Sequence, residues 1–465
     1  MTGLSVTSSD GTHATLNETS VRDFAAQLRG QLLCPPDAGY DAARKVWNGM
    51  IDRRPALIAR CAGVADVIAA VRFASDHRLL LSVRGGGHNI TGNAVCEGGL
   101  MIDLSLMKSV RVDPAARTAR AEAGLTWGEY NRETQAFGLA TTGGVVSTTG
   151  IAGLTLGGGL GWLMGKHGLS CDNLLSADIV TAEGRFLTAS DKQNPDLFWG
   201  LRGGGGNFGV VTSFEYQLHP VGPTLAGMVL YPMADAKKVL SFYRDFARSV
   251  PDEALIAAAL MTSPEGKPVV AIIPSYIGDP AIGNDVLAPL RRLGTPLLDT
   301  IAPVSYVQLN QLFDASVPYG SVQRYWKSSF LRELGDDLVE VMVSRSQKML
   351  SPMSMVLFFH MHGAAARVDP DATAFGARAN QWDYDVISQW TDVTESPTHI
   401  QWTREFWTAV EPFASGDVYV NHLDSEEGPR ITAAYRRNYD RLVGLKNKYD
   451  PTNLFRLNQN IQPTI

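Results

Sequence analysis

The stretch Ser82-Val83-Arg84-Gly85-Gly86-Gly87-His88-Asn89 joins an apolar run at residues 79–83 to a glycine-rich turn. The apolar run is typical of a buried strand. Three consecutive glycines have no Cβ atoms, so the backbone can lie directly against a ligand. Successive backbone N–H groups in such a turn also form a concave anion site, and Arg84 adds a positive charge. The segment therefore predicts a ligand-binding turn at the end of a strand.

A second run of this kind follows about 60 residues later. It begins with Ser147-Thr148-Thr149-Gly150 and continues with Gly153 and with the glycines at 157–159. Hydroxyl groups and bare amides together suit a pyrophosphate that is held by loops rather than by a helix N-terminus. One glycine run alone would favour a tight turn without a ligand, whereas two favour a ligand.

Two familiar phosphate motifs fail on their context. Gly204-x-Gly206-x-x-Gly209 has the spacing of the dinucleotide fingerprint, but a helix-like segment precedes it and a strand-like segment follows it, which is the reverse of what that motif needs. Gly165-Lys166 resembles the end of a P-loop, yet His167 stands where Ser or Thr would hold magnesium. Neither motif predicts a nucleotide site by itself.

The composition excludes several classes of function. The chain has 465 residues with 41 Lys and Arg against 47 Asp and Glu, so the net charge is −6. A mildly acidic chain without basic blocks argues against nucleic-acid binding and against a membrane surface. No secretory signal and no run of about 20 apolar residues is present, and the four cysteines lack CxxC pairing. We expect a cytoplasmic protein without metal, whose cysteines are buried thiols.

Hydrophobic periodicity predicts the order of the elements. Residues 1–18 are polar and predict a loose arm, and a composition shift at 220–223 predicts a domain boundary. The predicted helices are 21–33, 64–77, 126–137, 196–199, 338–349 and 377–390, and the predicted strands are 79–83, 100–104, 118–123, 178–181, 186–189, 210–216, 228–231, 269–274, 355–362 and 417–422.

The segment around His88 resembles the histidyl-FAD attachment site of the berberine-bridge-enzyme-like oxidases, within the vanillyl-alcohol-oxidase/p-cresol-methylhydroxylase superfamily. Other matches follow in the same order over essentially the whole chain. They are Val46-Trp47-Asn48-Gly49, the glycine stretch 143–161, His167-Gly168-Leu169 with Asp172-Asn173, Ala177-Asp178-Ile179-Val180, Asp196-Leu197-Phe198-Trp199, Tyr419-Val420-Asn421, and Tyr449-Asp450-Pro451 with Asn458-Gln459-Asn460.

The resemblance implies an α+β fold. A p-cresol-methylhydroxylase-type FAD-binding domain of two subdomains (21–220) follows the N-terminal arm (1–20). A substrate domain (221–415) has an antiparallel sheet covered by helices, and a C-terminal segment (416–465) completes the first domain. The FAD-binding residues expected from the motifs are Arg84, Gly85, Gly86, Gly87, His88, Asn89, Val146, Ser147, Thr148, Thr149, Gly150, Gly153, Leu154, Gly158, Gly159, Gly161, Asn173, Ile179, Val180, Asn421, Asn458 and Asn460.

By the same resemblance, a ring nitrogen of His88 attacks the 8α-methyl group of the flavin and forms a permanent link. Many members carry a second link from a cysteine to C6 of the flavin. Val146 occupies that position here and cannot form the bond, while Cys171 lies beyond the glycine cluster. We therefore expect one covalent link. Thr149 stands where family oxidases often have valine, a position that influences access of O2.

The catalytic residues are expected at the Tyr-x-Asn motif. On a strand at 417–422, Tyr419 and Asn421 would share one face and His422 would point the other way. The resemblance implies that Tyr419 is the base and that Asn421 lies near the flavin. A phenol with a pKa near 10 needs a neighbouring cation to act as a base, and Lys327 is the candidate. The alternative for Tyr419 is a buried strand tyrosine that only anchors its hydroxyl.

His360 and His362 alternate with Phe358 along a predicted strand, where they would line the substrate or act in acid–base catalysis. Other family members carry a carboxylate near this point, and none is seen here.

The sequence therefore predicts an FAD-dependent oxidase of a CH–OH or CH–NH compound that reduces O2 to hydrogen peroxide. The alternatives are an oxygenating or cyclising enzyme or a dehydrogenase, and, in another class, a flavin-binding protein without turnover. The expected partners are a small-molecule substrate and O2, in a monomer or homodimer. The missing second link argues against a large oligosaccharide.

Overall fold

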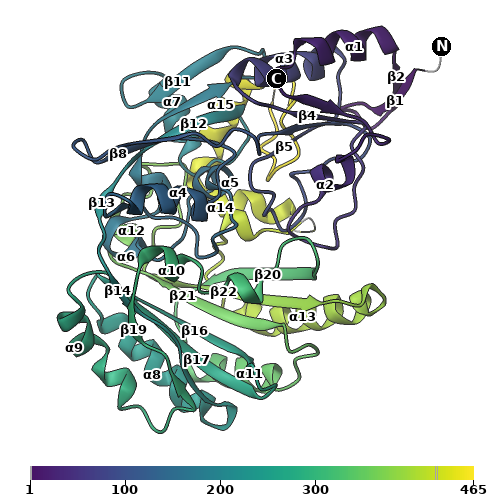
Figure 1. Ribbon diagram of the computed structural model, residues 1–465. Helices are drawn as coiled ribbons and strands as arrows, with labels where there is room; N and C mark the ends of the chain where they lie inside the picture. The colour runs from purple at the N-terminus through teal and green to yellow at the C-terminus, as the bar shows by residue number, and fades with distance from the viewer. Residues whose placement is uncertain (1–2, 425, 427, 465) are drawn as a thin grey trace.

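A computed structural model describes residues 3–424, 426 and 428–464 of the chain. Figure 1 shows two parts: an upper part that holds both chain termini, and a lower part built on one large sheet. The architecture is α+β, as the sequence predicts.

A four-stranded sheet in the upper part leads to the first glycine turn. Its strand order is β3-β4-β6-β5, and β4, β6 and β5 run parallel. The helix α3 (Val64–Asp76) connects β4 to β5 and buries its apolar side against the sheet. Because β5 ends at Arg84, the glycine turn begins at the carboxyl end of a parallel strand, where α/β sheets commonly bind ligands. The strands are β3 (Gln31–Leu33), β4 (Leu57–Arg60), β5 (Leu81–Arg84) and β6 (Leu100–Asp103).

A five-stranded antiparallel sheet with the order β11-β10-β12-β8-β7 forms the rest of the upper core. The glycine run near residue 150 leads into the short helix α5. The elements here are β7 (Val110–Asp113), β8 (Thr118–Glu122), α4 (Trp127–Gln135), β9 (Leu139–Ala140), α5 (Ile151–Leu156), α6 (Met164–His167), β10 (Leu174–Val180), β11 (Phe186–Ser190), α7 (Pro195–Leu201), β12 (Val210–Gln217) and β13 (His219–Pro220).

A nine-stranded antiparallel sheet forms the lower part, with the central order β17-β16-β21-β22-β20. One of its faces packs on helices α8, α11 and α13 through side chains such as Trp382, Tyr384 and Val386. The opposite face turns toward the glycine loops (Figure 1). The elements are β14 (Thr224–Ala226), β15 (Val229–Pro232), α8 (Ala236–Ser249), β16 (Ala254–Thr262), β17 (Pro268–Tyr276), α9 (Pro280–Arg291), β18 (Leu298–Asp299), β19 (Ala302–Val304), α10 (Tyr306–Asn310), β20 (Gln323–Leu331), α11 (Asp336–Ser346), β21 (Met355–Met361), α12 (Ala364–Arg367), β22 (Gln381–Trp390) and α13 (Ser396–Val410).

The C-terminal segment returns to the upper part. After α14 (Ile431–Tyr435) and α15 (Tyr439–Tyr449), Leu454, Phe455 and Ile461 join the core of the four- and five-stranded sheets. The buried Lys446 ammonium donates to Asp450 and to the carbonyls of Asn207 and Phe455, which fixes this segment beside the glycine run at 203–209. On these core memberships we propose domain boundaries near residues 220 and 415, with 416–465 completing the first domain; the hairpin before residue 21 belongs to that domain as well.

Three sequence expectations need correction. Residues 4–16 are not a loose arm but the hairpin β1 (Leu4–Thr7) and β2 (His13–Leu16), because Val6 and Leu16 are buried in the upper core. The predicted helix at 21–33 is α1 (Glu18–Gln27) followed by β3, and α2 (Tyr40–Arg44) comes next. The predicted helix at 377–390 is the strand β22, in which Trp382, Tyr384 and Val386 alternate with polar residues.

The predicted strand at 417–422 is also wrong. The pairing with β20 lies before this segment: Ala414 bridges to Leu331, Ser415 donates its N–H to the Phe330 carbonyl, and Phe330 donates its N–H to the Asp417 carbonyl. The chain then turns inward and forms a 3₁₀ turn over Val420–His422. Side-chain alternation therefore does not apply beyond Tyr419, and this changes where His422 points.

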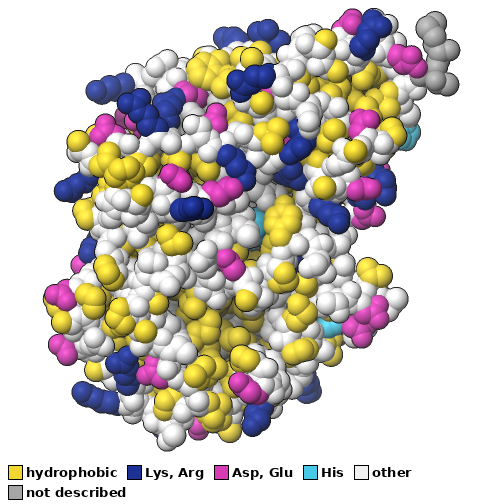
Figure 2. All heavy atoms as spheres, in the orientation of Figure 1, with side chains coloured by type: hydrophobic (Ala, Val, Ile, Leu, Met, Phe, Trp, Pro, Cys, Tyr) yellow, Lys and Arg dark blue, Asp and Glu magenta, His cyan; other side chains and the backbone are white. Residues whose placement is uncertain are grey.

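The surface carries mixed charges (Figure 2), and the cysteines form no disulfide. Figure 2 shows Lys and Arg mixed with Asp and Glu over the visible face, with apolar side chains gathered in its lower half. No helix among the described residues is long and apolar enough to cross a membrane. All four cysteines are free thiols, and Cys61, Cys96 and Cys171 are buried.

Candidate active site

A long cavity lies between the glycine loops of the upper part and the nine-stranded sheet. Its lining includes Gly153, Gly206, His88 and Asn458 from the upper part, together with side chains of the large sheet. The cavity thus joins a backbone-lined channel to a side-chain-lined chamber.

The two glycine runs meet inside the upper part. A Cβ atom on Gly86 would lie 2.3 Å from the backbone nitrogen of Gly150, and a Cβ on Gly150 would lie 2.4 Å from that of Gly86. Only a glycine on each side permits this approach, since real Cβ atoms do not come so close to backbone. The fold therefore brings together segments that lie 60 residues apart in the sequence.

Other glycines leave open space for a ligand. Gly153 and Gly206 line the cavity, and a Cβ atom on either would meet nothing within 4 Å. Asn458 also lines the cavity, and its side-chain oxygen is buried and has no hydrogen-bond partner among the described residues. Buried acceptors without partners call for donors from a ligand. The bare amides suit a pyrophosphate, and a free acceptor suits a ribityl hydroxyl or an N–H group of the flavin ring. These features fit FAD.

His88 lines this cavity and is held on all sides. Its ring stacks on Trp47 with centroids 5.0 Å apart. Its Nε2 lies 2.8 Å from the Thr148 hydroxyl, and its Nδ1 lies 3.3 Å from the Thr149 hydroxyl. Burial, together with the charge of Arg324, lowers the pKa of His88 to about 3, so the imidazole is neutral at physiological pH. A neutral, oriented imidazole is the form that can act as a nucleophile.

The structure separates the predicted cofactor residues into two groups. Arg84 is not an anion ligand, because both sides of its guanidinium bind the buried Asp103. The Oδ1 of Asn173 accepts from His219, and its Nδ2 donates to the carbonyls of His167 and Leu169, so Asn173 does not line the cavity. Ser147 donates to Asp314 of the lower part. The predicted residues that line the cavity are Gly85, Gly86, Gly87, His88, Asn89, Val146, Thr149, Gly150, Gly153, Leu154, Gly161, Asn421 and Asn458; those outside its lining are Arg84, Ser147, Thr148, Gly158, Gly159, Asn173, Ile179, Val180 and Asn460.

Tyr419 is 1% exposed and lies at the cavity wall beside Asn421. Its hydroxyl oxygen accepts the backbone N–H groups of Gly159 and Leu160 at 3.0 and 3.4 Å, and the Asn421 amide at 2.8 Å. These donors favour a phenolate, but burial outweighs them and raises the pKa of Tyr419 above its ordinary value. Tyr419 is therefore a neutral phenol at physiological pH, anchored to the glycine turn.

Lys327 does not supply the cation expected beside Tyr419. Its ammonium lies 2.6 Å from the Asp424 carboxylate, and both side chains are buried. The ammonium also lies 5.3 Å from the Trp407 ring centroid. Lys327 is absent from the cavity lining, so its contacts are those of a structural ion pair between β20 and the C-terminal segment.

His360 and His362 are on the wrong face of β21 for a role in the cavity. Met355, Leu357 and Phe359 of that strand line the cavity, so the even-numbered positions face the helices. Burial lowers the pKa of His360 to about 4, and its ring binds the Ala247 carbonyl and Asn380. His362 lies 3.0 Å from the Ala254 carbonyl. Both histidines therefore fasten the sheet to its neighbours.

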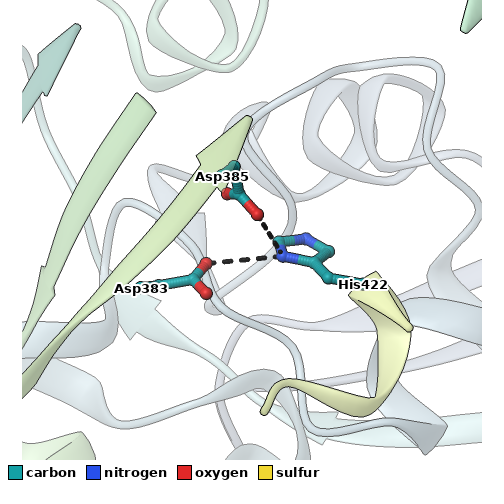
Figure 3. Close-up of side chains that lie close together, drawn as sticks. All are labelled: Asp383, Asp385 and His422. Atoms are coloured by element: carbon teal, nitrogen blue, oxygen red, sulfur yellow. Dashed lines mark ion pairs between the residues drawn. The ribbon is translucent and has the colours of Figure 1, made fainter. Parts of the chain in front are cut away.

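Three ionisable side chains line the cavity together: Asp383, Asp385 and His422 (Figure 3). The two aspartates project from β22, and His422 projects from the 3₁₀ turn after Tyr419. His422 Nδ1 lies 3.0 Å from Asp385 and 3.5 Å from Asp383. Trp326 donates its indole N–H to Asp385 at 2.7 Å. All three residues line the cavity, so they form an acid–base cluster that faces the substrate space.

Asp383 and His422 have shifted pKa values, and the shifts give them different charge states near neutral pH. Burial and the neighbouring charge of Asp385 raise the pKa of Asp383 to about 6. Burial alone would lower the pKa of His422, but Asp385 and Asp383 outweigh it and raise it to about 10. His422 is thus a cation near neutral pH, while Asp383 titrates close to neutrality. A carboxylate with such a pKa can accept a proton and release it again.

Sequence reasoning missed this cluster for two identifiable reasons. The prediction of a helix at 377–390 hid Asp383 and Asp385, and the prediction of a strand at 417–422 turned His422 away. The alternation of Trp382, Tyr384 and Val386 with polar residues is a period-two signal that would have placed both aspartates on one face of a strand. No carboxylate lies on β21 itself, and the two aspartates come from β22, which pairs with it.

A fold of this kind, with a glycine-lined channel opening onto an acid–base cluster, defines an enzyme that holds a dinucleotide cofactor against its substrate. The family model for the FAD binding domain matches residues 55–190, and that for berberine and berberine-like proteins matches residues 418–462. The chain belongs to the berberine-bridge-enzyme-like family of FAD-linked oxidoreductases.

The relatives match over nearly their full length. An FAD-linked oxidoreductase of Dictyostelium discoideum is 33% identical and the match covers 95% of this chain and 97% of that protein. The (R)-6-hydroxynicotine oxidase of Paenarthrobacter nicotinovorans is 31% identical, with 94% and 97% covered. The crystal structure of 6-hydroxy-D-nicotine oxidase from Arthrobacter nicotinovorans has a TM-score of 0.86 at 31% identity, with 94% and 98% covered. This chain is an FAD-dependent oxidoreductase.

Proposed function

We propose that this enzyme is an oxidase that carries FAD on His88 and oxidises a small molecule at a CH–OH or CH–NH group. The observation that carries the proposal is that His88 and the Asp383–Asp385–His422 cluster line one continuous cavity. When bound, the flavin supplies a hydride acceptor at N5 and a route for the electron pair to O2. The cluster supplies the base that such a reaction needs.

Asp383 is the best-placed proton acceptor. Its carboxylate lies at the cavity wall, and its pKa of about 6 leaves it mostly ionised at neutral pH. The hydroxyl or amine of the substrate would give its proton to Asp383 as the hydride leaves the adjacent carbon. Asp385 is held by Trp326 and His422, so its role is to position the cluster. This assignment replaces Tyr419 as the base.

The walls of the chamber indicate what kind of molecule it accepts. Phe313, Met355, Leu357 and Phe359 form apolar sides, and Trp326 lies against His422 with ring centroids 4.7 Å apart. An apolar or aromatic body would cover these walls, while its hydroxyl or amine would meet the carboxylates. This supports a compact apolar substrate over a sugar chain, whose many hydroxyl groups would lack partners here.

The anaerobic reduction of the bound flavin tests the function directly. Matched apolar alcohols, phenols and amines are mixed with the enzyme without O2, and bleaching of the yellow flavin absorbance is followed. Readmission of O2 should then restore the colour and release one hydrogen peroxide per turnover. Bleaching without reoxidation by O2 would indicate a dehydrogenase, and no bleaching by any compound would favour a flavin-binding protein without turnover.

The covalent link is tested by acid precipitation. The pellet of the unmutated enzyme should stay yellow, whereas His88→Ala should release its flavin into the supernatant. A single link is expected, because Val146 lines the cavity where a cysteine would be needed and Cys171 is fully buried outside the cavity lining. Burial also raises the pKa of the Cys171 thiol, which disfavours a reactive thiolate. Free flavin from the unmutated enzyme would refute the link.

A further inference from the structure

A buried arginine lies behind the residue that stacks on His88. Arg324, on β20, is 2% exposed. Among residues 3–424, 426 and 428–464, no carboxylate forms an ion pair with it, and burial lowers the pKa of its guanidinium to about 10. Its guanidinium donates instead to the carbonyls of Trp47, Val322 and Pro318 and to the side chain of Gln389. A buried cation that lacks a counter-charge is costly, so its position calls for a reason.

The Trp47 indole contacts both the guanidinium and the imidazole. The central carbon of the guanidinium lies 3.9 Å from the centroid of the Trp47 ring, a cation–π contact. The His88 ring stacks on the same indole, with the two planes inclined by only 19°. Trp47 therefore links Arg324 of the nine-stranded sheet to the first glycine turn.

Trp47 is fixed in this stack by its own hydrogen bonds. Its backbone N–H donates to the Gly87 carbonyl at 3.0 Å, and its indole N–H donates to the Val317 carbonyl at 3.2 Å. Its carbonyl accepts from Arg324 at 2.7 Å. The indole cannot tilt without breaking contacts on both sides of the cavity. Arg324 therefore fixes the orientation of the indole, and the indole fixes the orientation of the imidazole that stacks on it.

We propose that Arg324, acting through Trp47, is a positioning residue that fixes the plane of the His88 imidazole for attachment of the flavin. The inference rests on the proposed covalent link. The charge of Arg324 adds to burial in disfavouring an imidazolium, and the indole fixes the plane of the ring, while Thr148 and Thr149 meet its two nitrogens. The other charged or titratable neighbour that contacts His88 is the Tyr319 ring, 5.8 Å away between centroids.

The attachment reaction defines what the stack must achieve. A carbon–nitrogen bond forms between a neutral ring nitrogen of His88 and the 8α-carbon, and one N–H and one C–H bond break. The two hydrogens and the electron pair are taken up by the flavin itself and then pass to O2, which becomes hydrogen peroxide. The protein has only to present an unprotonated nitrogen at the right angle.

The experiment compares the attachment rate in four full-length proteins: unmutated, Arg324→Gln, Arg324→Lys and Trp47→Phe. Each is made with limiting flavin and then incubated with FAD and O2, and the flavin in acid-precipitated protein is measured over time alongside total bound flavin. Arg324→Gln should slow attachment by about tenfold or more, the size expected for a desolvated cation–π contact. Arg324→Lys should restore part of the rate, because it keeps the cation.

The pH dependence and the total bound flavin separate positioning from mere folding. Attachment should not change between pH 6 and 8 in either the unmutated enzyme or Arg324→Gln, because burial, the larger cause, keeps the pKa of His88 low in both. A slower rate at every pH with unchanged total bound flavin then reports the position of the ring. Trp162→Phe, a buried tryptophan outside the cavity lining, is the matched control for Trp47→Phe and should attach flavin normally.

Two results would overturn the proposal: an unchanged rate in both Arg324→Gln and Trp47→Phe, or loss of total bound flavin in parallel with covalent flavin. If Arg324→Gln does not fold, Trp47→Phe decides the matter by the same measurements. Failure of the covalent link itself is distinguished first, since the unmutated enzyme would then show no acid-stable flavin at all.

Discussion

The two ends of the cavity are built in opposite ways. The cofactor end consists of backbone: Gly86 and Gly150 touch each other, and Gly153 and Gly206 leave room. The substrate end consists of side chains from distant segments, with Asp383 and Asp385 on β22 and His422 on a turn near the C-terminus. A backbone-lined site is visible in the sequence as runs of glycine. A site made of side chains becomes visible only when the elements that carry them are correctly identified.

The largest effect is expected when the charge of Asp383 is removed, which tests whether this residue is the base. Asp383→Asn keeps the shape but cannot accept a proton, so flavin reduction in stopped-flow experiments should slow by about 10³-fold. Tyr419→Phe removes an anchored neutral phenol and should cost about tenfold or less. The reverse ranking would return the role of base to Tyr419 and leave Asp383 a structural residue.

A pair of glycine substitutions tests the cofactor end. Gly150→Ala places a methyl group 2.4 Å from the backbone nitrogen of Gly86, so the two loops must separate, and both thermal stability and flavin content should fall. Gly153→Ala meets no protein atom and lies in α5, where alanine favours the helix. It should leave the flavin-free protein as stable as before, or more so, while weakening FAD binding. Equal flavin binding in Gly153→Ala would show that the cofactor does not pass this residue.

The pH dependence of flavin reduction tests the charge states at the substrate end. Because Asp383 must be ionised to act, the rate of flavin reduction should fall as pH drops through about 6. The positive charge of His422 lowers the pKa of Asp383, and the charge of Asp385 raises it. His422→Asn should therefore move the acidic limb to higher pH, and Asp385→Asn should move it to lower pH, each by about one unit. Shifts in the same direction for both variants would contradict the cluster.

The smallest expected effect concerns metal ions. Asp383, Asp385 and His422 are also residue types that bind divalent metals, and their ligand atoms lie within 4.8 Å of one another. We expect no change in activity on dialysis against a chelator, because His422 Nδ1 already lies 3.0 Å from Asp385 in an ion pair. Loss of activity that zinc or manganese restores would replace the acid–base cluster with a metal centre.

The comparison also explains which predictions failed. Helix 64–77 and the strands 100–104 and 210–216 were predictable because their apolar spacing agrees with their burial. The segment at 377–390 was assigned a helix although its alternation favours a strand, and that error concealed the two aspartates. His360 and His362 were placed in the cavity because a strand's sequence shows two faces but not which face is covered by helices.

The sequence by itself determined the family, the α+β architecture and the glycine runs at the cofactor end, because these depend on short segments whose backbone requirements are local. Only the tertiary structure decided which side chains meet at the substrate end. It paired Arg84 with Asp103 and Lys327 with Asp424, and it gathered Asp383, Asp385 and His422. The physical reason is that the charge state and role of a buried ionisable group depend on its neighbours in space, which are distant in the chain.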